Sequence, residues 1–240
     1  MTPRIFGIEH ILYLTVYLAV AIGCFIWVMQ KNRSEQARTL FRQIVALVLL
    51  FCIVWNRISI VIHSHAAGYD ETYNWWRLLP ESFCGLNSLF FSILALCFKE
   101  DHPYLHHTAF VAIYGGALNT VYPTYLGQAD SFLYPATISG MLHHSVSLLL
   151  AIYLIATGYI HPGIRKFPYF FFGMAAYVAW GTLLLALFPD FEHYDPMYLT
   201  APLLPNTFLT WYVAGLLVFI VHAAVLACFS LFHKKKSAQP

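Results

Sequence analysis

Cys84 is the residue of this sequence best suited to covalent chemistry. It follows Leu79-Pro80-Glu81-Ser82-Phe83 and stands at the start of an apolar run that continues to Phe98. Proline is favoured in the first turn of a helix, so Pro80 predicts a helix start with Cys84 about one turn inside. The positive end of the helix dipole favours the thiolate, which is the nucleophilic form of cysteine. Cys84 is therefore a candidate nucleophile, although many buried cysteines are only small inert hydrophobes.

Two charged residues are candidates to assist this cysteine. Arg57 falls inside another apolar run, where it is expected to bind an oxyanion or a lipid phosphate, or to favour the Cys84 thiolate. The alternative is that its long side chain only reaches out to the membrane interface. Glu81 is expected to pair with Arg57, or else to stabilise the helix N-terminus as a negative charge.

Amides and imidazoles within other apolar runs complete the candidate site. Asn56 and Asn119 are candidates for oxyanion binding, with ordinary hydrogen bonds between helices as the alternative. His143 and His144 are candidates for the general base. Adjacent residues of a helix point about 100° apart, so at most one of the two imidazoles is expected to aim straight at a given site.

Composition identifies a membrane protein. Of the 240 residues 60% are hydrophobic and only 10% are charged, whereas a soluble domain has about 25% charged residues. The net charge is only +2, so the sequence lacks the strongly basic character typical of nucleic-acid-binding proteins. The five cysteines have no regular spacing, which argues against a disulfide framework or a zinc site. Because the sequence has neither a phosphate-binding loop nor an H-E-x-x-H motif, no cofactor or metal is expected.

Apolar runs predict an all-α protein, a single seven-helix transmembrane bundle over residues 1–240. A membrane span needs about 20 mostly apolar residues. Runs of this kind lie at approximately 8–29, 43–63, 79–98, 105–122, 139–158, 168–188 and 208–232.

Loop charges predict the orientation of this bundle. Basic residues mark cytoplasmic loops, and they occur in segments 30–42, 99–104 and 159–167 and in the C-terminal tail, for example Lys31, Lys99, Arg165 and Lys234. Segments 123–138 and 189–207 contain only acidic charges, namely Asp130, Asp190, Glu192 and Asp195. We therefore expect the N-terminus outside and the C-terminus in the cytoplasm.

This orientation brings polar groups of five spans to one depth near the outer side. Intramembrane polar groups tend to face the bundle interior or water, so their common depth is the strongest functional signal in the sequence. The inner halves of the spans are mostly apolar. His222 is an exception there, and it is expected to be structural.

Two motifs resemble a known family. Leu79-Pro80-x-x-x-Cys84, followed by an apolar helix and Lys99, resembles the YwaF-type family of bacterial integral membrane proteins. His144-Ser145-Val146 is similar to that family's second marker, a histidine that opens a span. The family is similar to a eukaryotic multi-span acyltransferase that remodels ether phospholipids through a cysteine and a histidine. The resemblance implies Cys84 as nucleophile, His144 as its histidine, and a location in a bacterial cell membrane.

The favoured hypothesis is a membrane-embedded phospholipid acyltransferase or transacylase. Cys84 would attack a phospholipid ester with His144 as general base, and a lysophospholipid would accept the acyl group from the thioester. The alternative is a transporter or receptor-like bundle whose outer polar cluster binds a solute or lipid, or relays protons. Replacement of Cys84 by serine separates the two, because a carrier should tolerate it.

The predicted topology can be tested by labelling single cysteines in intact cells. Residues 123–138 and 189–207 should be modified from outside by an impermeant thiol reagent, whereas position 236 should be protected because basic loops stay in the cytoplasm. Labelling of position 236 from outside would contradict the predicted orientation.

Overall fold

The computed structural model describes residues 3–30, 33–66, 73–98, 101–123, 126, 131–188, 195–202 and 207–237. In these ranges the chain forms seven α-helices: α1 Ile8–Met29, α2 Glu35–Ala66, α3 Phe83–Cys97, α4 Pro103–Val121, α5 Pro135–Ala156, α6 Phe167–Leu187 and α7 Trp211–Ser237. Short 3-10 helices are η1 Trp75–Leu78, η2 Ile164–Lys166 and η4 Pro196–Tyr198. Several charges used to predict the orientation lie outside the described residues, namely Lys31, Lys99, Asp130, Asp190 and Glu192.

The prediction of an all-α membrane protein is confirmed for the described part of the chain. Five segments are long and apolar enough to cross a bilayer, and they comprise α1, most of α2, α5, α6 with η2, and most of α7. Helix α3 is apolar but has only 15 residues. The count of seven spans and the orientation of the termini therefore stay predictions.

Three helices begin four or more residues from their predicted starts, and one of them is α5, which begins at Pro135 rather than 139. Helix α2 begins at Glu35 rather than 43, after Ser34 Oγ accepts the N–H of Ala37 at 3.1 Å. Helix α3 begins at Phe83 rather than in the 79–80 region, because Ser82 caps it by accepting the N–H of Gly85 at 3.1 Å. Cys84 is consequently the second helical residue, and Glu81 lies before the helix.

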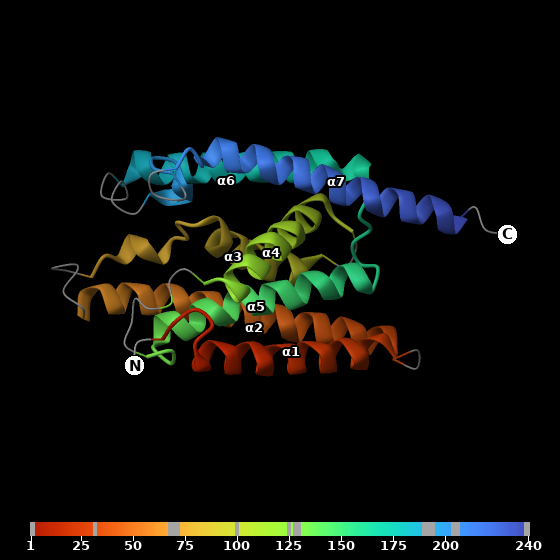
Figure 1. Cartoon of the computed structure of the whole chain (residues 1–240), viewed down its shortest axis with the longest axis horizontal. Coiled ribbons are helices and arrows are strands. Elements are labelled where there is room, and N and C mark those ends of the chain that lie inside the picture. The colour runs from red at the N-terminus through yellow and green to blue at the C-terminus, as the bar shows by residue number, and fades with distance from the viewer. Residues whose placement is uncertain are drawn as a thin grey trace.

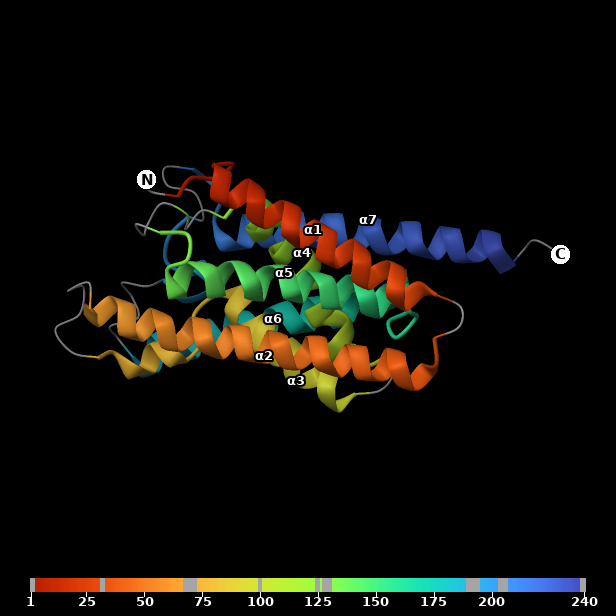
Figure 2. The same cartoon turned by 90° about the horizontal axis from the view of Figure 1, so that it is seen from below.

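The helices form three layers (Figure 1). Helices α1, α2 and α5 make one layer, α6 and α7 make the opposite one, and α3 and α4 lie between them. Consecutive helices run back and forth along the long axis, so that α1 begins and α7 ends at opposite ends of the bundle (Figures 1 and 2). The start of α3 and the end of α4 thereby lie at the same end of the molecule.

Two buried apolar clusters hold the layers together. The larger one joins α2, α3, α4 and α5 and includes Leu49, Phe91, Leu105 and Leu154. The second joins α3 and α4 to the α6–α7 layer and includes Leu86, Phe110, Phe170 and Leu226. The middle layer thus contributes to both cores, which fixes the position of α3 and α4 from both sides.

Helix α1 is attached mainly near its two ends. Its buried residues are His10 and Val28. The Nδ1 atom of His10 accepts the N–H of Phe6 at 3.0 Å, so the ring proton must sit on Nε2, which donates to the carbonyl of Thr120 at 3.0 Å. The hydroxyl of Tyr13 also bonds to Ser145 Oγ on α5.

A glycine allows α4 and α5 to approach closely. A Cβ atom on Gly116 would lie 2.9 Å from the carbonyl oxygen of His144 and 3.1 Å from the Cβ of Leu148. Small residues allow this kind of approach between membrane helices, where close packing is an important source of association. Gly116 therefore sets the distance between α4 and the helix that carries both candidate histidines.

Gly116→Ala should destabilise the protein by about 1–3 kcal/mol, because the added methyl group has no space against the α5 backbone. Gly23→Ala on α1 is the matched control, since a Cβ atom there has no neighbour within 4 Å. The thermal unfolding midpoint of purified protein in detergent should fall for Gly116→Ala and hold or rise for Gly23→Ala. Equal midpoints would refute the close contact.

Candidate functional site

Cys84 lies at the N-terminus of α3 with its sulfur packed against α4. The residue is half-buried, and a Cβ atom on Gly115 would lie only 2.7 Å from its Sγ atom. The Nδ2 group of Asn119, one turn further along α4, donates to Cys84 Sγ at 3.7 Å and to the Gly115 carbonyl at 3.0 Å. Gly115 therefore provides the space for the sulfur, and Asn119 provides a polar contact.

The face of α3 that carries Cys84 also contacts the histidine pair. Ser88, one turn after Cys84, bonds through Oγ to His143 Nδ1 at 3.1 Å. The rings of His143 and His144 have centroids 4.1 Å apart and planes inclined by 35°. Both residues are buried. Thus, although consecutive residues leave the helix in different directions, the two imidazoles lie side by side.

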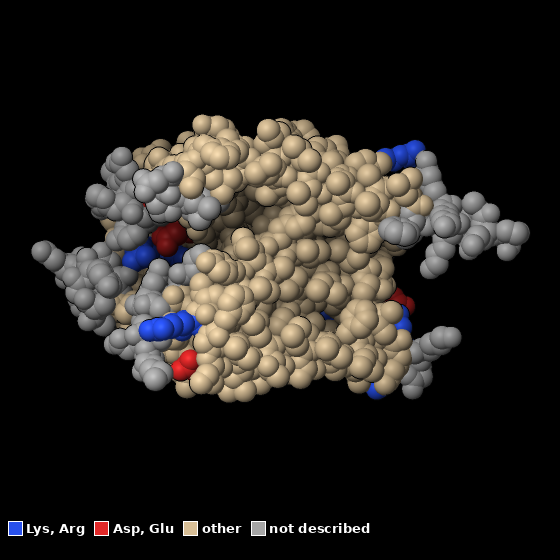
Figure 3. All heavy atoms as spheres, viewed as in Figure 1, with Lys and Arg blue, Asp and Glu red and all other residues tan. Residues whose placement is uncertain are grey.

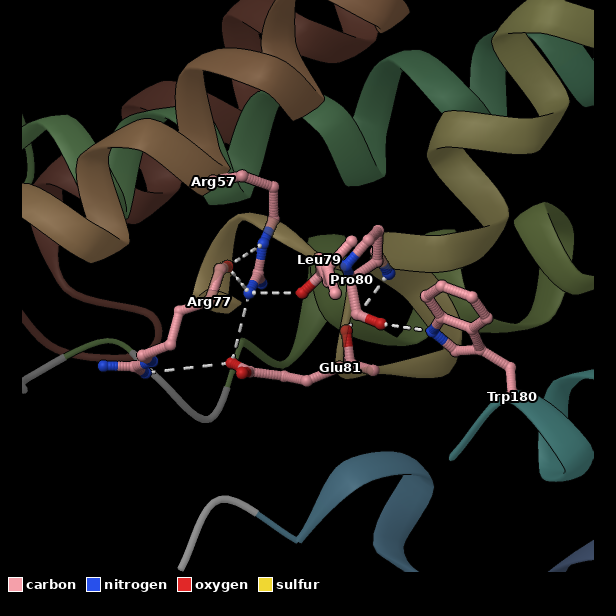
Figure 4. A network of polar contacts seen from close by, with 8 residues as sticks. Arg57, Arg77, Leu79, Pro80, Glu81 and Trp180 are labelled. Carbon is pink, nitrogen blue, oxygen red and sulfur yellow. Dashed lines mark hydrogen bonds and ion pairs between the residues drawn. The ribbon is translucent and has the colours of Figure 1, made fainter. Parts of the chain in front are cut away.

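Arg57 holds the segment that precedes α3 (Figure 4). Its Nε donates to the carbonyl of Arg77 at 3.0 Å, and one terminal nitrogen donates to the carbonyls of Arg77 and Leu79, the latter at 3.1 Å. That nitrogen also lies 3.4 Å from Glu81 Oε1. The predicted pairing of Arg57 with Glu81 is confirmed, and the guanidinium group is occupied by this segment.

Two arginines meet one carboxylate beside this segment. Glu81 Oε1 is also 3.7 Å from a terminal nitrogen of Arg77, so two guanidinium groups share one carboxylate. The three side chains are 8%, 13% and 15% exposed for Arg57, Arg77 and Glu81 respectively. Arg57, Arg77 and Glu81 thus form a partly buried ionic cluster beside the start of α3.

Asn56 has a different position from Asn119. Its Nδ2 donates to the carbonyl of Ala136 at 3.1 Å and to Ser139 Oγ at 3.2 Å, so it joins α2 to the start of α5. This is the interhelical hydrogen bond that was the alternative interpretation of the residue. Of the two predicted amides, Asn119 is the one whose side chain contacts Cys84.

Several polar residues beside the site were not among the sequence candidates. Asn87 accepts from the Tyr177 hydroxyl at 2.9 Å and donates to the Thr108 carbonyl at 2.9 Å. Asn87 and Ser88 form a polar pair inside an apolar run, and this signal could have identified them. Nothing local marks Tyr177, because its partner is 90 residues away.

His222 has partners that the sequence did not suggest. Its Nδ1 lies 2.9 Å from the Tyr114 hydroxyl, and its ring stacks on Phe170 with centroids 4.0 Å apart. The ring of His106 lies 6.0 Å away. Among the described residues, no three His, Cys, Asp or Glu side chains gather as a metal ion would require.

Comparison with known proteins gives one family assignment. The model of the TMEM164 family matches residues 5–233, which covers nearly the whole chain. No curated protein and no solved structure matches. The match supports a membrane protein of this type, whereas the YwaF-type resemblance and a bacterial cell membrane stay predictions.

Replacement of Arg57 should loosen the start of α3. Arg57→Met leaves the Glu81 carboxylate and the 77 and 79 carbonyls without their main donor, which should cost about 3–5 kcal/mol, the usual cost of breaking a buried ion pair. Hydrogen exchange at residues 77–86 should accelerate more than in the core of α5. The double variant Arg57→Met, Glu81→Met should recover part of the lost stability. Protection from hydrogen exchange equal to wild type in Arg57→Met would contradict the role of Arg57 in holding this segment.

Proposed function

This chain belongs to the TMEM164 family of membrane proteins, and we propose that it is a phospholipid acyltransferase in which Cys84 carries the acyl group. The observation that supports the proposal is the position of the Cys84 sulfur. It lies at a helix N-terminus, and the Asn119 Nδ2 group donates to it at 3.7 Å. A helix N-terminus and an amide donor are suited to a negative charge, whether on sulfur or on an oxyanion.

In the first half-reaction, His144 takes the thiol proton and the sulfur attacks the ester carbonyl of a phospholipid. The single bond between the acyl carbon and the ester oxygen breaks, and the imidazolium gives its proton to the departing alkoxide. The lysophospholipid departs, and the acyl group stays on Cys84 as a thioester. In the second half, the hydroxyl of a lysophospholipid acceptor gives its proton to His144 and attacks the thioester. The C–S bond breaks and the sulfur regains the proton.

Two groups are suited to the developing oxyanion. Asn119 already directs its amide at Cys84 Sγ. The N–H groups of the first two residues of α3, one of them Cys84 itself, have no acceptor within the helix. Donors fixed before the reaction stabilise such a charge without reorganisation. His143, which Ser88 holds through Nδ1, would orient His144 through their adjacent rings.

The surroundings of the site are suited to a lipid substrate. Figure 3 shows a surface that is hollowed between the α6–α7 layer and the rest of the bundle, with charged side chains recessed at one end and uncharged walls elsewhere. The apolar walls would accept acyl chains.

Cys84→Ser should abolish acyl transfer, whereas Cys97→Ser on the same helix should leave it unchanged. Purified wild-type protein given phospholipid should gain one acyl mass on Cys84, and hydroxylamine should remove it. His144→Ala should slow formation of the adduct by about 10²–10⁴-fold, the usual contribution of a general base, and more than His143→Ala. Acyl transfer by Cys84→Ser would show that Cys84 does not carry the acyl group, whereas absence of both adduct and transfer in wild type would favour the alternative of a solute-binding or transporting bundle.

A further inference from the structure

Residues 195–201 form a segment whose backbone is held in an unusual conformation. Asp195, Met197 and Tyr198 have positive φ angles of 44°, 56° and 54°. Residues other than glycine rarely adopt this left-handed region, and they stay there only where their surroundings hold them. The Asp195 carboxylate supplies part of this hold, since it accepts the N–H and the hydroxyl of Thr200, both at 2.7 Å, and the N–H of Ala201 at 3.1 Å.

Met197 fastens this segment to α6 and to the start of α3. Its N–H donates to the carbonyl of Glu81 at 2.8 Å, and its side chain is fully buried. A Cβ atom on Gly181 would lie 2.7 Å from Met197 Cγ, so the methionine fills a notch in α6 that exists because residue 181 has no side chain. Next to this notch, Trp180 Nε1 donates to the carbonyl of Pro80 at 2.8 Å.

This arrangement lies close to Cys84, because Met197 bonds to the carbonyl of Glu81, three residues before the cysteine. Helix α4 contacts the sulfur through Gly115 and Asn119. Met197 packs in the apolar cluster that contains Leu86 and is flanked by Phe83, the residues on either side of the Cys84–Gly85 pair. Partial burial raises the pKa of the neighbouring Tyr198 phenol, and Cys84 adds to that shift, which is consistent with a phenol close to the thiol.

We infer that residues 195–201 are a gate over Cys84 and that Met197 is its latch in the Gly181 notch. While the latch is seated, small molecules can reach the thiol and lipid-sized molecules cannot. When Met197 leaves the notch, the gate opens and the larger molecules gain access. The inference rests on the position of Cys84 and would hold even if the cysteine did not transfer acyl groups.

The gate can open without unfolding a helix. Among the described residues, a backbone hydrogen bond from Met197 to Glu81 fastens the segment next to α3, and the side chains of Met197 and Leu199 pack against α6 at Gly181. Opening would also release the left-handed backbone at Met197 and Tyr198 from its constraint. Segments with few fixed contacts open locally at a small fraction of the free energy of global unfolding.

Gly181→Ala tests the latch, because the added methyl group displaces Met197 from a site on α6 that is remote in sequence from Cys84. Gly173→Ala is the matched control. It lies on the same helix, and its added methyl group would press on the ring of His107 rather than on Met197. The readout is the rate at which a small iodoacetamide and a bulky polyethylene-glycol maleimide modify Cys84 in the full chain. The exposed Cys97 serves as internal reference.

In wild type, the bulky reagent should modify Cys84 much more slowly than Cys97. Gly181→Ala should raise the rate of Cys84 with the bulky reagent, relative to Cys97, by about tenfold or more, since the rate follows the population of the open state. The small reagent should gain far less. Gly173→Ala should keep the ratio within about twofold of wild type.

Met197→Ala provides a second route to the open gate without any added bulk, and it decides the question if Gly181→Ala does not fold. It too should accelerate the bulky reagent selectively. Equal acceleration by Gly181→Ala and Gly173→Ala, or no acceleration by Met197→Ala, would overturn the inference. Acyl transfer is not part of the readout, so loss of the proposed enzymatic function and loss of the gate would be seen separately.

Discussion

The capture of the backbone carbonyls just before α3 is the constraint on which the rest of the site depends. A buried backbone carbonyl without a hydrogen-bond donor costs free energy, so irregular backbone is stable inside a protein only where other groups satisfy it. Here the donors come from three distant places, namely Arg57 on α2, Trp180 on α6 and the N–H of Met197. Because they hold residues 77–81 outside the helix, α3 begins late and Cys84 falls in its first turn.

Polar side chains elsewhere in the bundle serve a related purpose. Asn56 joins α2 to α5, and Asn87 joins α3 to both α4 and α6. Apolar contact distinguishes poorly between a neighbouring helix and lipid, so hydrogen bonds and close packing at small residues specify which helices meet. Two adjacent glycines on α4 illustrate such packing. Gly115 makes room for the Cys84 sulfur, and Gly116 makes room for the α5 backbone at His144.

The sequence predicted the part of this structure that depends on local chemistry. Apolar runs located every helix within a few residues, except that α2 begins eight residues early, and residue types alone suggested the Arg57–Glu81 pair. The predicted start of α3 was wrong because Ser82, rather than Pro80, marks it by capping the helix. Tertiary contacts that the sequence does not show support this later start, since Trp180 and Met197 use carbonyls that a helix from Pro80 would have used. Met197 itself carries no signal in the sequence, since an isolated methionine in a loop gives no indication of a notch in a distant helix.

The attachment of α1 depends on a single proton. His10 accepts a backbone N–H at Nδ1 and donates from Nε2, so each ring nitrogen has one role and the neutral tautomer fills both. A second ring proton would set two donors against each other at Nδ1 and turn one of the few contacts of α1 into a repulsion. The side-chain amides of glutamine and asparagine also have one accepting and one donating group, but the two groups differ in spacing and direction from the two ring nitrogens of histidine. The requirement at this position is thus for a ring that accepts at one nitrogen and donates at the other in a fixed geometry.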